Sequence, residues 1–70
     1  MKNSKTHEQL LMNYKDSSIY PEVSNLLSQG FVVVVAYSND GERFRIVGKC
    51  LSKSEAWQRI GSKRNCFIVE

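Results

Sequence analysis

The stretch Phe31-Val32-Val33-Val34-Val35-Ala36-Tyr37 decides the fold of this chain, because it is the longest apolar run in 70 residues. Its β-branched and aromatic side chains favour a strand that is apolar on both faces. A strand of this kind would aggregate at the exposed edge of a sheet, so we expect it at the centre. Asp40-Gly41 then supplies the positive φ values of a tight hairpin turn, and a second strand over about 44–50 returns beside the first.

The apolar pattern also predicts the register of this hairpin. Pairing outward from the turn places, on one face, Tyr37 opposite Phe44, Val35 opposite Ile46, Val33 opposite Gly48 and Phe31 opposite Cys50. The other face carries the apolar Val32, Val34, Ala36 and Val47 beside the cations Arg43, Arg45 and Lys49. Two alternatives stay open for this second face. Either the two N-terminal helices cover it while the basic side chains cross its rim, or it is an open interaction or dimer face.

Capping residues predict three helices. Thr6-His7-Glu8-Gln9 and Ser52-Lys53-Ser54-Glu55 both fit the capping-box pattern, and they start helices at about 7–15 and 53–60. Pro21 suits the first turn of a further helix at about 20–29, and Gly30 suits its end. A last strand follows at 66–69.

The resulting order is ααββαβ, and two rules predict its topology. The first strand is central, and the crossover through the last helix to the third strand is right-handed. Together they give a sheet of order 2-1-3. The fold class is therefore α+β: one small two-layer domain over residues 1–70, in which a three-stranded antiparallel or mixed sheet packs with helices. We expect Leu26, Val33, Val35, Ile46 and Trp57 to form the main core.

Residue types that could carry out catalysis are sparse. His7 is the only histidine, and the sequence has no C-x-x-C, Walker loop, G-x-S-x-G or dinucleotide fingerprint. Cys50 and Cys66 fall on the two outer strands, about 10 Å apart, whereas a disulfide needs Cα atoms within about 7 Å. We therefore expect two free thiols, no catalytic residue, no metal, no cofactor and no enzymatic activity.

The basic charge is concentrated in the second half of the chain. Residues 1–41 hold three basic and four acidic side chains, whereas residues 42–70 hold seven basic and three acidic ones, which gives a net charge of +3. A basic surplus suits an acidic partner. We expect the partner-binding residues to be Arg43, Arg45, Val47 and Lys49 on the second strand and Arg59, Lys63 and Arg64 at the end of the last helix.

These features favour a small non-enzymatic regulator or inhibitor that occludes an acidic face of a partner protein. The alternative is a nucleic-acid-binding accessory protein that uses the basic strand face, although aromatic platforms among the cations are lacking. Self-association into a homodimer would add stability to so small a core. The longest apolar run has seven residues, far fewer than the ~20 that span a bilayer, and residues 1–9 do not resemble a signal peptide. We expect a cytoplasmic protein that does not bind membranes.

The segment Arg59-Ile60-Gly61-Ser62-Lys63-Arg64-Asn65-Cys66-Phe67 resembles the passage from helix to strand in some small phage-encoded proteins, anti-CRISPR inhibitors among them. The resemblance covers nine of the 70 residues and transfers no functional residue. It implies that a phage- or mobile-element-encoded inhibitor is one form that such a regulator could take.

Overall fold

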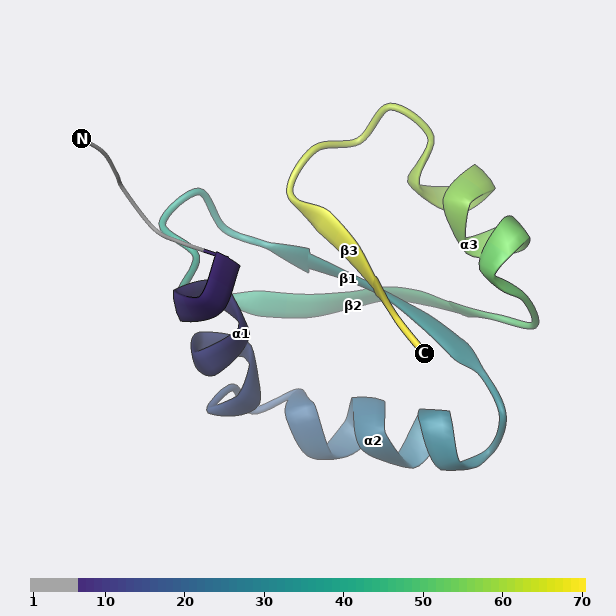
Figure 1. Cartoon of the computed structure of the whole chain (residues 1–70), viewed down its shortest axis with the longest axis horizontal. Helices are drawn as coiled ribbons and strands as arrows, with labels where there is room; N and C mark the ends of the chain where they lie inside the picture. Colours follow the sequence, from purple (N-terminus) through teal and green to yellow (C-terminus); the bar gives the residue numbers. More distant parts are fainter. Residues whose placement is uncertain (1–6) are drawn as a thin grey trace.

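The computed structural model describes residues 7–70, the side chain of His7 excepted (Figure 1). Its elements are α1 (His7–Lys15), α2 (Tyr20–Ser28), β1 (Val32–Tyr37), β2 (Phe44–Cys50), α3 (Lys53–Ile60) and β3 (Cys66–Val69). The strands form one antiparallel sheet of order β2-β1-β3. The α+β class, the order ααββαβ and the central place of the first strand are therefore confirmed. No helix among the described residues has the length and apolar character to cross a membrane.

The predicted start of α3 is confirmed in detail. The Ser52 hydroxyl accepts a hydrogen bond of 3.1 Å from the Glu55 backbone N–H, and the Glu55 carboxylate accepts one of 3.1 Å from Leu51 N–H. These two bonds satisfy backbone donors that the helix itself leaves unpaired. Pro21 lies in the first turn of α2, as expected. The capping box proposed for α1 involves Thr6 and His7 and lies outside the described residues.

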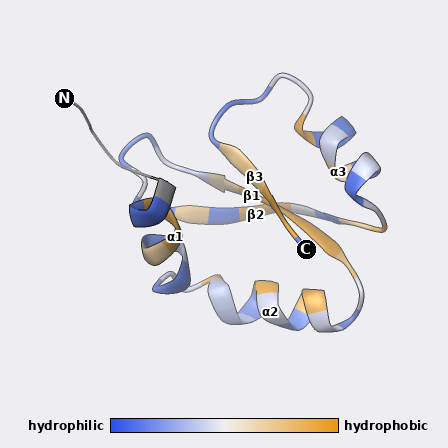
Figure 2. Ribbon diagram, in the orientation of Figure 1, coloured by the Kyte–Doolittle hydropathy of each residue, from blue (hydrophilic) through white to orange (hydrophobic). Residues whose placement is uncertain are grey.

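Helices lie on both faces of the sheet, whereas the expected two-layer arrangement has helices on one face only. On one face, α1 and α2 pack against the sheet through a cluster formed by Tyr14, Val23, Val33 and Val35. On the other face, α3 packs through Val34, Cys50, Ala56 and Ile60. Figure 2 shows hydrophobic stretches in the strands at the middle of the molecule, whereas hydrophilic and hydrophobic residues alternate along α1 and α2. The face that carries Val32, Val34, Ala36 and Val47 is thus covered in part, and by α3 instead of the two N-terminal helices.

Trp57 does not belong to the core, contrary to expectation. Its side chain is 61% exposed, whereas Ala56 is completely buried and Ile60 is 7% exposed. Successive residues of a helix are rotated by about 100°, so the face that presents Ala56 and Ile60 to the sheet turns Trp57 to the flank. The other predicted core residues are correct, because Val33 and Val35 are completely buried and Leu26 and Ile46 pack against them.

A β-bulge changes the predicted register in the far half of the hairpin. Tyr37 pairs with Phe44 and Val35 with Ile46, as expected, but the register shifts between Val34 and Val35. The remaining pairs are Val34 with Gly48, Val33 with Lys49 and Val32 with Cys50, so the predicted pairs Val33–Gly48 and Phe31–Cys50 are wrong. One extra residue in β2, Val47, reverses the face of every side chain that follows it. Cys50 consequently joins the core under α3.

The hairpin loop is also longer than the predicted tight turn. Only Gly41 has a positive φ, of +72°, and Asp40 does not. Gly41 N–H donates to the Ser38 carbonyl at 2.8 Å, which closes a β-turn over residues 38–41. The Asp40 carboxylate accepts hydrogen bonds from the Ser38 hydroxyl and from Glu42 N–H. Polar side chains therefore order this loop, and they position the start of β2.

Candidate functional site

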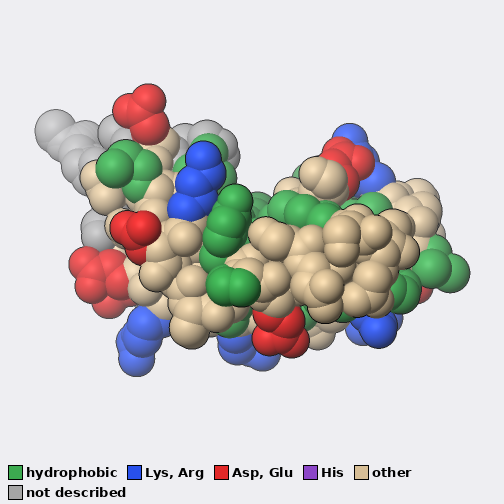
Figure 3. Space-filling model, turned by 90° about the horizontal axis from the view of Figure 1, so that it is seen from below, with side chains coloured by type: hydrophobic (Ala, Val, Ile, Leu, Met, Phe, Trp, Pro, Cys, Tyr) green, Lys and Arg blue, Asp and Glu red, His purple; other side chains and the backbone are tan. Residues whose placement is uncertain are grey.

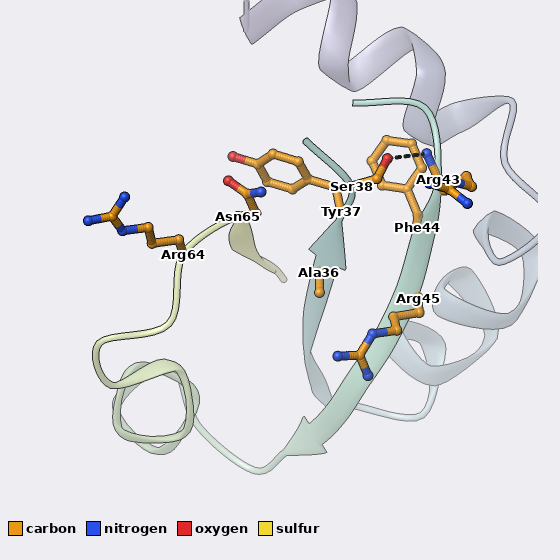
Figure 4. Close-up of a pocket in the computed structure, with 8 residues that line it drawn as sticks. All are labelled: Ala36, Tyr37, Ser38, Arg43, Phe44, Arg45, Arg64 and Asn65. Atoms are coloured by element: carbon orange, nitrogen blue, oxygen red, sulfur yellow. Dashed lines mark hydrogen bonds between the residues drawn. The ribbon is translucent and has the colours of Figure 1, made fainter. Parts of the chain in front are cut away.

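Three arginines line an open hollow at the hairpin end of the sheet, and their side chains extend in different directions (Figure 4). Its volume is about 380 Å³. Arg43 and Arg45 stand on one side, at the start of β2, and Arg64 stands on the other side, in the loop after α3. The remaining lining residues are Ala36, Tyr37, Ser38, Phe44 and Asn65. We call this site the arginine hollow.

The two sides of the arginine hollow are held by hydrogen bonds of the backbone and of the Ser38 hydroxyl. Ser38 N–H donates to the Arg43 carbonyl at 2.9 Å, and Arg43 N–H donates to the Ser38 hydroxyl oxygen at 3.0 Å. On the other side, Tyr37 N–H donates to the Asn65 carbonyl at 2.8 Å. The end of β1 therefore fixes both Arg43 and the residue next to Arg64.

The guanidinium groups of the arginine hollow are available to a ligand. Arg43, Arg45 and Arg64 are all exposed, and none of them forms an ion pair with a carboxylate of residues 7–70. Within that same part of the chain, Lys53 and Glu70 do form an ion pair, with 2.8 Å between Nζ and Oε2. By contrast, basic and acidic side chains are interspersed on the α2 side of the molecule (Figure 3). The arginine hollow thus concentrates one sign of charge.

The other predicted partner-binding residues have different positions. Arg59 lies on the α3 face with its side chain over Gly48, where an added Cβ would approach its guanidinium nitrogen to 3.1 Å. Lys63 Nζ donates to the Arg59 carbonyl at 3.3 Å, near the end of α3. Val47 is half-buried in the core under α3.

Lys49 was wrongly predicted to extend the basic strip of Arg43 and Arg45. The bulge at Val47 places Lys49 on the other face of the sheet, where it pairs with the buried Val33. There its Nζ lies 4.5 Å from the centroid of the Phe31 ring, in a cation–π contact. The basic strip is therefore two residues long on β2, and the third cation comes from Arg64 instead.

Five lining residues were not among the predicted partner-binding residues: Ala36, Tyr37, Ser38, Phe44 and Asn65. Asn65 carried a recognisable signal, since asparagine is among the few residues that tolerate a left-handed backbone, and its φ is +59°. Ser38 lies next to the predicted turn, where serine commonly bonds to nearby backbone groups. Tyr37 was predicted only as the hairpin partner of Phe44.

The chemistry of the arginine hollow is that of an anion site. Arginine presents its N–H groups in a planar fork, which matches the two oxygens of a carboxylate or the oxygens of a phosphate. The lining contains no carboxylate, imidazole or thiol. Among the described residues, no group of three or more His, Cys, Asp or Glu side chains could hold a metal ion. Cys50 and Cys66 are both free.

Comparisons with known proteins found no family model, no curated protein and no solved structure that matches this chain. The nine-residue resemblance of residues 59–67 to small phage-encoded proteins is therefore not extended to the rest of the chain.

Proposed function

We propose that this protein is a non-enzymatic regulator or inhibitor that binds an acidic face of a partner protein through the arginine hollow. The observation that carries the proposal is that Arg43, Arg45 and Arg64 line one open hollow and that no carboxylate of residues 7–70 is paired to them. Aspartate and glutamate side chains of the partner would occupy the hollow. The protein would act by covering the surface that it binds.

The physical basis is the difference between an unpaired and a paired guanidinium group. An arginine already paired within its own chain would have to give up that contact to bind a partner, whereas these three lose only water. Three cations on one small area also steer an acidic partner into position and raise its association rate. Exposed charges contribute less at high ionic strength, so binding should weaken as salt is added.

A protein partner is favoured over nucleic acid by the aromatic side chains nearest the arginine hollow. Binding of single strands needs aromatic rings on which bases can stack. Tyr37 and Phe44 instead belong to a cluster of rings, with their centroids 6.4 Å apart and 5.9 and 6.3 Å from Phe67. Trp57 is exposed, but it lies on α3 and does not line the hollow. A phage- or mobile-element-encoded inhibitor, as the resemblance of residues 59–67 implies, would be one form of this function.

The test compares the parent chain with a double charge reversal, Arg43→Glu with Arg45→Glu. The probe is a fluorescein-labelled peptide of alternating Glu and Gly, and binding is followed by fluorescence anisotropy. We expect the parent to bind the peptide and the double variant to lose binding, while circular dichroism stays unchanged. Exposed substitutions of this kind usually cost less than about 0.5 kcal/mol of stability.

The matched control is Lys15→Glu with Lys49→Glu, which changes the net charge equally away from the arginine hollow. This control should bind the peptide nearly as well as the parent. Equal loss of binding in both double variants would show a general charge effect and contradict the proposal. A labelled single-stranded DNA of similar charge, bound more tightly than the peptide and equally sensitive to the Arg43 and Arg45 changes, would favour the nucleic-acid alternative.

A further inference from the structure

A glycine in the middle of β2 makes room for the side chain of Arg59. Gly48 pairs with Val34, which belongs to the cluster under α3, so Gly48 lies on the α3 face of the sheet. A Cβ atom added to Gly48 would lie 3.1 Å from Nη1, 3.2 Å from Cδ and 3.4 Å from Cζ of Arg59. The backbone of Gly48 does not have a positive φ. The close approach of Arg59 therefore accounts for a glycine in this strand.

Two arginines of β2 lie on this same face of the sheet. Arg45 pairs with Ala36, which follows Val34 by two residues on β1. Alternate residues of a strand share a face, so Arg45 lies on the α3 face, and so does Arg43, two residues before it. We call Arg43, Arg45 and Arg59 the arginine row.

The β-bulge gives the arginine row an even spacing. Across the hairpin, Arg43, Arg45 and Gly48 lie opposite Ser38, Ala36 and Val34. These three residues of β1 are two apart along the strand, which gives a repeat of about 7 Å. Without the extra residue in β2, Val47 would lie opposite Val34, and its side chain would occupy the space of Arg59. The bulge thus places the third guanidinium group in line with the first two.

Arg59 is as available to a ligand as the other members of the arginine row. Glu55 precedes Arg59 by one helical turn, a spacing at which such side chains often pair. The Glu55 carboxylate instead accepts a hydrogen bond from Leu51 N–H at 3.1 Å. Within residues 7–70, Arg59 forms no ion pair with a carboxylate, and its side chain is exposed.

We propose that the partner presents an extended segment with an acidic residue at every second position, and that this segment lies along the arginine row. Alternate side chains of an extended chain project to the same side about 7 Å apart. This repeat equals that of the arginine row, so three carboxylates face three guanidinium groups. The inference rests on the proposed function, and it adds Arg59 to the binding surface.

The position of α3 favours an extended segment over a helix of the partner. α3 packs mainly over β1, and β2 lies one interstrand spacing, about 5 Å, to the side. Packed helices are about 8–10 Å apart, so a second helix could not lie directly over β2. A single extended chain is narrower and can follow the outer side of β2.

The test uses two fluorescein-labelled pentapeptides of identical composition and charge, Glu-Gly-Glu-Gly-Glu and Gly-Glu-Glu-Glu-Gly. In the second peptide, when extended, the middle glutamate points away from the other two, so only two carboxylates can face the arginine row. We measure the affinity of the parent for each peptide by fluorescence anisotropy at low ionic strength. The alternating peptide should bind about threefold more tightly, which is the effect of one exposed ion pair.

Two variants should abolish this preference, and one control should keep it. Arg59→Gln removes the third cation, so the ratio of the two affinities should fall to about one. A change in net charge affects both peptides equally, and the ratio therefore reports the spacing alone. Gly48→Val should have the same effect without a charge change, because the valine side chain occupies the space of Arg59. The matched control is Lys49→Gln, on the other face of β2, which should keep the threefold preference.

The outcomes separate this inference from the proposed function. Equal binding of both peptides by the parent, or a preference that survives in Arg59→Gln, overturns the inference. So does a preference that is lost in Lys49→Gln. In these cases the proposed function stands if Arg43→Glu with Arg45→Glu still abolishes binding. If neither peptide binds the parent, or if that double reversal has no effect, the proposed function and the inference both fail. Arg59→Gln decides the matter if circular dichroism shows that Gly48→Val alters the fold.

Discussion

The side chain of Asn65 donates a hydrogen bond of 2.7 Å from Nδ2 to Oδ1 of Asn39, and this bond joins the loop after α3 to the hairpin loop. The two loops carry opposite sides of the arginine hollow. The Asn65 carbonyl is bound to Tyr37 N–H as well. Asn65 therefore sets the position of Arg64 relative to Arg43 and Arg45.

Two substitutions at Asn65 should separate its backbone role from its side-chain role. Asn65→Ala loses the side-chain bond and keeps a strained left-handed backbone at φ +59°, so we expect a loss of about 1–2 kcal/mol in the free energy of unfolding. Asn65→Gly loses only the bond and should cost about 1 kcal/mol or less. Urea unfolding measures both values. Affinity for the acidic peptide should fall equally in both variants, and an unchanged affinity in Asn65→Gly would contradict the positioning role.

Core truncations should show that stability depends on the valines and not on the tryptophan. Val35 is completely buried, so Val35→Ala should cost about 2 kcal/mol of the free energy of unfolding. Trp57→Ala should cost less than about 0.5 kcal/mol, because the side chain is mainly exposed. Urea unfolding should be measured at low micromolar protein, where association contributes least. Equal losses for the two variants would place Trp57 in the core after all.

Stability should decline at alkaline pH because of Tyr14. Burial, and secondarily the neighbouring Tyr20, raises the pKa of the Tyr14 hydroxyl. The folded state therefore holds this proton more tightly than the unfolded state, whose tyrosine has a pKa of about 10. The resulting stability is complete below about pH 10 and is lost as the pH rises through the folded-state pKa. Tyr14→Phe should lessen the decline in urea-unfolding free energy between pH 8 and pH 11, and an identical decline in both chains would refute this assignment.

The sequence predicted the elements and the sheet order because their signals are local. The apolar run of β1 required a central position, and Ser52 and Glu55 marked the start of α3. The register near the turn followed from Tyr37 and Phe44. The bulge at Val47 was missed, although Gly48 in the strand interior was a possible signal, since glycine often marks a bulge.

The arginine hollow was only half predictable. Arg43 and Arg45 were placed together because the hairpin register near the turn is local. Arg64 was assigned to a separate cluster, since its approach to β2 depends on how the loop after α3 returns to the sheet. Trp57 was wrongly assigned to the core because a large aromatic side chain next to Ala56 favours burial. In the structure, α3 packs on the sheet through the small side chain of Ala56.

The most direct test of the central claim is a titration of ¹⁵N-labelled protein with the Glu-Gly peptide, followed by amide and arginine side-chain NMR signals. We predict the largest shifts at the Nε–H groups of Arg43, Arg45 and Arg64 and at the side-chain amide of Asn65, with little change at Lys15 and Lys49. Shifts that are confined to other surfaces, or that are no larger at the three arginines than at Lys15 and Lys49, would contradict the proposal that the arginine hollow binds acidic partners.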